Sequence, residues 1–236
     1  MVVRSMSIRK VDTFEIPTAI DVLAKGDGAR IGGISTCETS LTIEKHTLKE
    51  YIANYEETIT ETITVYDKSA EDYFSYNQYL KNRTFKIFFD EQTHTLYSSA
   101  PSIITHKFLN HLSKNDTANV SGIHSLAFDF DSVANQLIVT KLIRFDTDDD
   151  HVHKKTFGGD DVAKNIEAID ALDNDSTIQL IGKLRVGQSD HTISISKPGT
   201  LVVYTRIDTP TKAKPEPMLE FTIRVLDELK INELKV

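Results

Sequence analysis

Residues 84–115 read TFKIFFDEQTHTLYSSAPSIITHKFLNHLSKN, and their patterning is the clearest in the chain. Two strand-like runs, 84–90 and 94–100, are separated by a short polar turn, which is typical of a β-hairpin. In the segment that follows, 101–115, Ile104, Phe108 and Leu112 recur at every fourth position, which predicts an amphipathic helix. The stretch therefore predicts a β-β-α unit in which the helix covers one face of the hairpin.

The sequence before this unit predicts a mixture of strands and helices. Strand-like content or alternation predicts strands over three segments: 2–16, 35–45 and 58–67. Helical patterning predicts helices over three others: 17–25, 47–57 and 69–82. The first of these helices has Pro17 near its first turn, and the last begins with an approximate capping pattern of Ser69 and Asp72.

The second half of the chain predicts further hairpins and two helices. Strand-like runs at 124–131 and 136–146 suggest a second hairpin. Three more runs are separated by the turns GQSD and PG and predict a three-stranded meander: 177–186, 191–197 and 200–208. One helix is expected over 159–173, with these residues on one face: Val162, Ile166, Ile169 and Leu172. A last helix is expected over 221–234, with these residues facing inward: Phe221, Val225, Leu226 and Leu229.

These elements predict an α+β fold in which antiparallel β hairpins and a meander are packed with separate helices. The polar segment KNDTANVSG, residues 114–122, ends in glycine and is the best candidate for a boundary between two lobes. We expect an N-terminal α+β lobe over 1–117, with the β-β-α unit, and a C-terminal α+β lobe over 118–236. A single domain is the alternative, because 236 residues fit one large domain or two small ones.

Composition indicates a packed, acidic protein. Hydrophobic residues make up 39% of the chain and charged residues 26%, with a net charge of -8. An acidic balance argues against a general nucleic-acid binder. Cys37 is the only cysteine, so no intrachain disulfide can form, which fits a reducing compartment. No signal-peptide pattern is present, and no stretch approaches the roughly 20 apolar residues of a membrane span. We therefore expect a cytoplasmic protein without a membrane partner.

The segment RFDTDDDHVHKKTFGGDD, residues 144–161, contains six carboxylates and two imidazoles. Asp146, Asp148 and Asp150 have the spacing of the first three calcium ligands of an EF-hand. The match fails beyond them, because His151 stands where the loop needs glycine and Phe157 where it needs a bidentate glutamate. The segment is therefore not an EF-hand.

A transition-metal site is the second interpretation of this segment. His151 and His153 form an H-x-H pair, which on a strand would project both rings to one face. Such a pair binds a divalent metal when a third protein ligand joins it, either one of the nearby aspartates or a residue distant in the sequence. The simpler interpretation is a solvated loop between a strand ending near Phe145 and a helix starting near Asp160.

The charge is uneven along the chain. Residues 178–214 contain six bases and two acids, a net charge of +4 that leaves -12 for the rest of the chain. On the expected strands, Lys183 and Arg185 share a face with Gln179, and Tyr204 shares one with Arg206. Two further bases, Lys212 and Lys214, are expected on the adjoining loop. Bases beside an aromatic ring on an exposed sheet can bind phosphates and stack a nucleobase, whereas the simpler interpretation is the solvated side of a sheet.

These observations favour a non-enzymatic binding or regulatory protein, of the kind represented by bacterial or phage accessory factors. It would contact nucleic acid through the basic C-terminal sheet or a protein partner through its acidic surface. The alternative is a metal-dependent hydrolase in which the Asp/His cluster at 146–153 holds a divalent metal and its bound water. In the first case no cofactor is expected, and the sequence does not indicate an oligomeric state.

Overall fold

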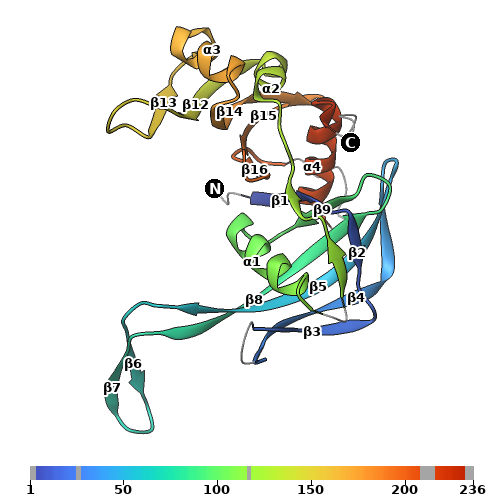
Figure 1. Ribbon diagram of the computed structural model, residues 1–236, viewed down its shortest axis with the longest axis vertical. Helices are drawn as coiled ribbons and strands as arrows, with labels where there is room; N and C mark the ends of the chain where they lie inside the picture. Colours follow the sequence, from blue (N-terminus) through green and yellow to red (C-terminus); the bar gives the residue numbers. More distant parts are fainter. Residues whose placement is uncertain (1–3, 25–27, 116–117, 208–215, 232–236) are drawn as a thin grey trace.

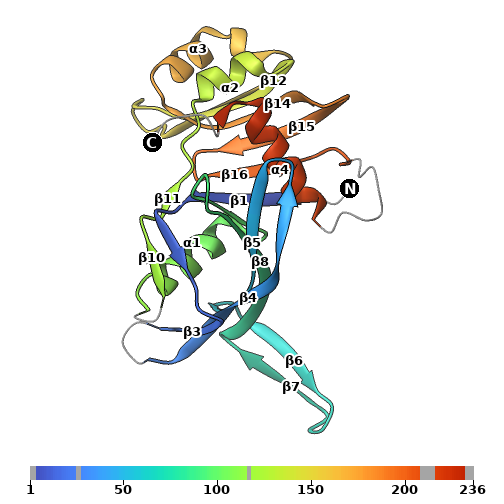
Figure 2. The same ribbon diagram turned by 90° about the vertical axis from the view of Figure 1, so that its right-hand side faces the viewer.

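The chain is α+β with a predominance of antiparallel strands, as the sequence predicts. A computed structural model describes residues 4–24, 28–115, 118–207 and 216–231 (Figures 1 and 2). About 20% of the described residues are helical and 51% are in strands. The described helices are α1 (Ser102–Leu112), α2 (Phe130–Gln136), α3 (Ile166–Asp173), α4 (Pro217–Glu228) and the single-turn 3-10 helix η1 (Val162–Lys164).

The strands follow one another with few helices between them. Those of the first half are β1 (Arg4–Lys10), β2 (Thr13–Glu15), β3 (Ala19–Leu23), β4 (Arg30–Ile43), β5 (His46–Ile59), β6 (Ile63–Asp67), β7 (Asp72–Tyr76), β8 (Tyr79–Asp90) and β9 (Thr95–Ser98). Those of the second half are β10 (Asn119–Ser121), β11 (His124–Ser125), β12 (Val139–Asp146), β13 (Lys154–Gly158), β14 (Thr177–Val186), β15 (Ser189–Ser196) and β16 (Thr200–Val203).

Twelve of these strands form one sheet, and β1 is the strand that joins its two parts. The order is β13-β12-β14-β15-β16-β1-β9-β8-β5-β4-β3, with β11 added beside β1. Along Arg4–Ser7, β1 pairs with β16 of the C-terminal meander, and along Ser7–Lys10 it pairs with β9 of the N-terminal strands. The first strand of the chain therefore pairs with strands from both halves of the sequence.

The predicted β-β-α unit is confirmed, and it lies between two hydrophobic cores. Ile87, Phe89 and Leu96 face the core that α1 covers, which we call the second core. The alternate residues Phe88 and Tyr97 belong to the first core, on the other face of the same hairpin. Burial on both faces explains why this part of the sequence is a nearly continuous apolar run rather than an alternating one.

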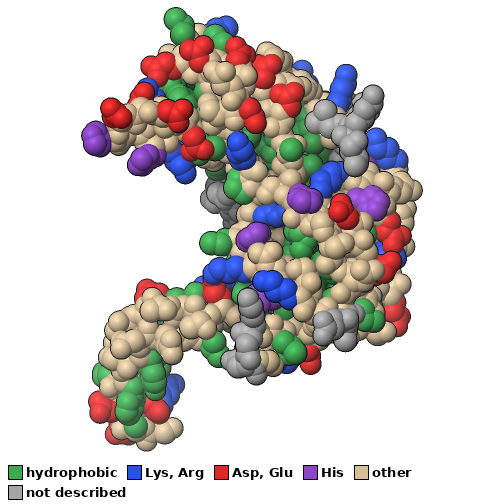
Figure 3. Space-filling view, viewed as in Figure 1, with side chains coloured by type: hydrophobic (Ala, Val, Ile, Leu, Met, Phe, Trp, Pro, Cys, Tyr) green, Lys and Arg blue, Asp and Glu red, His purple; other side chains and the backbone are tan. Residues whose placement is uncertain are grey.

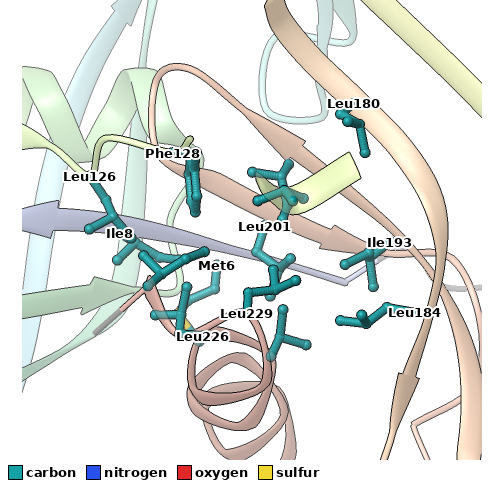
Figure 4. Close-up of a cluster of buried hydrophobic side chains, with 14 of the residues drawn as sticks. Met6, Ile8, Leu126, Phe128, Leu180, Leu184, Ile193, Leu201, Leu226 and Leu229 are labelled. Atoms are coloured by element: carbon teal, nitrogen blue, oxygen red, sulfur yellow. The ribbon is translucent and has the colours of Figure 1, made fainter. Parts of the chain in front are cut away.

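The first core lies between the meander and the helices α2, α3 and α4. The predicted meander is confirmed as β14-β15-β16. The terminal helix predicted over 221–234 is present as α4, which begins earlier, at Pro217, and ends at Glu228. Figure 4 shows Leu226 and Leu229, from α4 and its end, beside Met6 and Ile8 of β1 and residues of the meander. Side chains from both halves of the sequence thus share this core, and the division into lobes at residues 117 and 118 stays a prediction.

The helices predicted over 17–25, 47–57 and 69–82 are wrong. The segments form β3, β5, and β7 with the start of β8. In β5 the error has a specific cause, because the strand leaves one core for the other: Leu48 lies in the first core, whereas Tyr51 and Tyr55 lie in the second. Pairing of β5 with β8 is continuous, so these positions alternate normally between faces. Their separations of three and four residues nevertheless imitate a helical period.

Two predictions for the second half are also corrected. The hairpin expected from 124–131 does not form, because β11 is only two residues long and Asp129 caps α2 by accepting a hydrogen bond from the backbone nitrogen of Ser132. The helix expected over 159–173 is confined to α3, where Asn165 is the N-cap. Its buried face agrees only in part with the prediction: Leu172 is buried as expected, together with Ala168 and Ala171, whereas Ile166 is 77% exposed.

Candidate functional site

The hairpin β6–β7 is the element that projects furthest from the rest of the chain. It connects β5 to β8 and forms a two-stranded sheet of its own. Figures 1 and 2 show it extending away from both cores, so we call residues 60–77 the arm. A single two-stranded hairpin is at best marginally stable in water. Few packing contacts within the arm therefore compensate for the unfavourable exposure of its apolar side chains to water.

One face of the arm is an apolar ladder. Ile63 is directly opposite Tyr76, and Val65 is directly opposite Phe74, so these four side chains share a face. Val65 is 45% exposed, Phe74 42% and Tyr76 52%. Figure 3 shows hydrophobic side chains grouped on the arm, at the lower left of the view. This arrangement places large apolar surface in water.

The opposite face of the arm is aromatic as well. Tyr66 and Tyr73 are directly opposite each other, with ring centroids 5.0 Å apart, and both are exposed. Among the described residues, five of the thirteen exposed large hydrophobic side chains belong to the arm. A contiguous exposed apolar patch of this kind marks an interaction surface, whereas isolated apolar surface residues do not.

The tip of the arm is acidic. Asp67 lies directly opposite Asp72, and like charges in this position are unfavourable. The turn between them adds Glu71 and the only base of the arm, Lys68, while Glu61 lies near its start. Four acids against one base give the arm a net negative charge next to its apolar faces.

The arm lies partly in the segment 69–82, for which the sequence pattern predicts a helix, so the hairpin is not predicted. A usable signal is present: the polar turn DKSAED joins two short runs, ITVY and YFSY, that are rich in β-branched and aromatic residues. Recognising both runs as strands would have predicted the hairpin. The position of this hairpin away from both cores, however, depends on how far the paired strands β5 and β8 extend beyond the rest of the sheet.

The basic residues predicted for the C-terminal sheet are partly brought together. Lys183 and Arg185 share the face of β14 that is opposite the buried Leu184. Lys183 is paired with Thr192 of β15, whose carbonyl accepts a hydrogen bond from the backbone nitrogen of Tyr204 at 2.9 Å. Lys183 and Tyr204 therefore lie in one row across three chain segments.

The remaining predicted basic residues contribute unequally. Arg185 donates to Asp190 at 2.7 Å, and this bond lowers the pKa of the Asp190 carboxyl, so the positive charge is locally balanced. Arg206 is exposed beyond the end of β16. Lys212 and Lys214 lie outside the described residues. Arg144, which the sequence reading did not include, pairs in register with Gln179 on the same sheet.

The Asp/His cluster lies at the end of β12 and in the loop over 147–153 that joins it to β13, rather than in a loop leading to a helix. Asp146 is the last residue of β12, and β13 begins at Lys154. His151 has a left-handed backbone with φ 65°, so His151 and His153 are not on a strand that would align their rings. Asp148 and Asp150 also lie in this loop.

The described parts of the chain contain no group of three His, Cys, Asp or Glu side chains that could hold a metal ion. In the same loop, Asp149 forms an ion pair with Lys155 at 2.6 Å. The metal site proposed from the sequence stays a prediction and receives no geometric support from these contacts.

The fold and the arm thus define an α+β protein, mainly antiparallel β, with a projecting aromatic hairpin. No protein-family model matches the chain, and no curated protein is similar to it in sequence. None of the helices in the described residues has both the length and the apolar composition that crossing a membrane requires.

Proposed function

We propose that this protein is a non-enzymatic binding protein whose arm docks onto a partner protein. The observation that carries the proposal is the apolar ladder of the arm, in which Val65, Phe74 and Tyr76 are exposed and Ile63 is half-buried. Aromatic side chains are enriched at protein–protein interfaces, and a few of them usually supply most of the binding energy. The arm presents such side chains on a narrow projection that a groove can receive.

Charge defines the chemistry of the partner. The arm has four acids and one base. At its tip, two of the acids, Asp67 and Asp72, lie directly opposite each other on the two strands. A partner with an apolar groove and basic side chains at its rim would complement both features. Opposite charges at the rim increase the rate of association and select against other partners.

The test compares three forms of the chain as bait in extracts of the cells that encode it: wild type, Val65→Ser/Phe74→Ser, and Ile166→Ser. The third is the matched control, since Ile166 is a highly exposed apolar residue far from the arm. We expect one partner that the arm variant fails to retain and the control retains. With that partner purified, the arm variant should bind about 10- to 100-fold more weakly.

The charge requirement has its own readout. Asp67→Lys/Asp72→Lys should weaken binding by about tenfold or more at low salt, with a smaller difference at high salt. Equal retention of the partner by all three baits would exclude the arm as the interface. An arm-dependent dimer of the purified chain would also contradict the proposal, because the occupant would then be a second copy.

A second candidate function is nucleic-acid binding on the C-terminal sheet, favoured by the row that contains Lys183 and Tyr204. The probe is a single-stranded DNA oligonucleotide. If this function is correct, Lys183→Ala/Arg185→Ala should weaken binding and reduce the slope of log K against log salt by about 1–2. Lys49→Ala, an exposed lysine of β5, is the control and should have no such effect. Equal salt slopes for all three proteins would reject this function.

A further inference from the structure

A cavity of about 550 Å³ lies where β1, β9 and β11 meet. Its size is within the range of about 300–1,000 Å³ that is usual for sites of small molecules. The buried side chains of Val11, Leu126 and Ile231 line it, and we call these three residues the cavity floor. Val11 directly follows β1, Leu126 directly follows β11, and Ile231 lies after the end of α4. The cavity is therefore separate from the arm and from the basic row.

Three bases converge at the edge of this cavity: Lys10, His94 and His124. Lys10 is directly opposite His124 in the pairing of β1 with β11. The backbone nitrogen of Val11 donates to the carbonyl of His94 at 3.0 Å, which holds the third base next to Lys10. Figure 3 shows His side chains near Lys or Arg side chains at mid-height, where Figure 1 places β1 and β9.

The ammonium of Lys10 is half-buried and has no carboxylate partner within ion-pair distance among the described residues. It donates to the carbonyl of Thr93 at 2.8 Å and to Oγ1 of Thr95 at 2.9 Å. Burial lowers the pKa of Lys10, and the nearby Asp90 opposes this shift. Asp90 is occupied by other donors, so a cation at the cavity edge lacks a direct counter-ion.

The pairing of Lys10 with His124 places two nitrogen-bearing side chains on one face of neighbouring strands. An anion at this edge would accept a charge-assisted hydrogen bond from the Lys10 ammonium and a second hydrogen bond from the His124 ring. Among the described residues of the lining, Asp12 is the only carboxylate, and its backbone carbonyl accepts a hydrogen bond from Nδ1 of His94 at 3.0 Å.

We propose that this cavity binds a small amphipathic carboxylate, with its carboxylate between Lys10 and His124 and its apolar body on the cavity floor. A preformed apolar cavity with a few converging polar groups is the usual form of a small-molecule site. The bases would select an anion over a neutral molecule, and the floor would select a hydrocarbon chain over an inorganic ion.

The test is calorimetric titration of the full chain with hexanoate, octanoate and decanoate, and with 1-octanol as the neutral control. We expect one saturable site per chain for at least one carboxylate, with Kd between about 10 µM and 1 mM. Octanol should bind at least about tenfold more weakly than octanoate, because it has no charge to pair with the bases.

Two substitutions assign the site. Lys10→Met keeps the apolar stem and should weaken carboxylate binding by about tenfold or more. His124→Gln should also weaken carboxylate binding. Because His124 is exposed, this variant is expected to fold, so it still tests the site if Lys10→Met does not fold. Lys141→Met, an exposed lysine of β12, is the matched control and should bind like wild type. The proposal is overturned if none of the three carboxylates binds saturably, if octanol binds equally well, or if His124→Gln binds like the control.

Discussion

Replacing Asp90 by alanine is expected to reduce the free energy of unfolding by about 3–5 kcal/mol, the range found when one partner of a buried pair is removed. Asp90 is fully buried at the end of β8, and its Oδ2 lies 2.6 Å from Nδ1 of His46. The same oxygen accepts from the hydroxyl of Thr93 at 2.9 Å, and Oδ1 accepts from the backbone nitrogen of Gln92 at 2.9 Å. Alanine would leave His46 buried without this partner and the β8–β9 turn without its carboxylate.

The effect should depend on pH with a definite sign. Burial alone would raise the pKa of Asp90, but the hydrogen bonds from His46, Thr93 and Gln92 outweigh it and hold the pKa below its ordinary value. A carboxyl whose folded pKa is depressed stabilises the protein above its unfolded pKa of about 3.9, and this stabilisation is lost as the pH falls through the folded pKa. The difference between wild type and Asp90→Ala should therefore narrow below about pH 4.

Urea unfolding at pH 7 and in a series down to pH 3 measures both quantities. Glu91→Ala is the matched control, because Glu91 is the exposed neighbour of Asp90 and forms an ion pair with the exposed Lys49. A surface pair of this kind contributes about 0–1 kcal/mol. If Asp90→Ala loses no more stability than Glu91→Ala, the buried contact with His46 contributes little to the fold.

The parts of the fold that the sequence predicted correctly are those in which one local period is maintained. In β14, Leu180, Leu184 and Val186 are buried at alternating positions, and short turns join this strand to the next. In α1, Ile104, Phe108 and Leu112 keep a helical period against a single core. In each element the apolar residues mark one buried face, so their spacing within the segment is sufficient to identify the strand or the helix.

The failures occur where burial depends on distant parts of the chain. β5 changes from one core to the other along its length, so its apolar spacing no longer identifies a strand. In α3 two small alanines, Ala168 and Ala171, are buried beside Leu172, whereas Ile166 is exposed. Hydrophobicity alone predicts that Ile166 rather than the alanines faces the core.

The candidate sites were hard to predict for the same reason. The bases at the cavity come from strands that are far apart in sequence, and the bridge of β1 with β11 places Lys10 opposite His124. No sequence spacing relates these residues. The apolar ladder of the arm depends on the register that sets Val65 against Phe74. The basic row was closer to prediction, because Lys183 and Arg185 are on one strand and alternate with core residues.

Phe88→Ala and Phe108→Ala are each expected to lower the free energy of unfolding by about 3–5 kcal/mol, the usual cost of truncating a buried phenylalanine. Both side chains are fully buried, Phe88 in the first core and Phe108 in the second. In spite of this separation, we expect unfolding to remain a single transition in both variants. The reason is that β8 and β9 supply alternate residues to the two cores, so neither core can open without loss of strands from the other.

Denaturant unfolding followed by far-ultraviolet circular dichroism and by tyrosine fluorescence tests this coupling, since coincident curves indicate a single transition. Ile52→Ala is the control, because Ile52 is an exposed residue of β5 and should cost less than about 0.5 kcal/mol. Two separate transitions, of which Phe88→Ala shifts only one, would show that the cores unfold independently. The boundary near residue 118 would then divide two folding units. One shared transition would instead make β1, β8 and β9 the common framework of both cores and would place the arm on a single cooperative body.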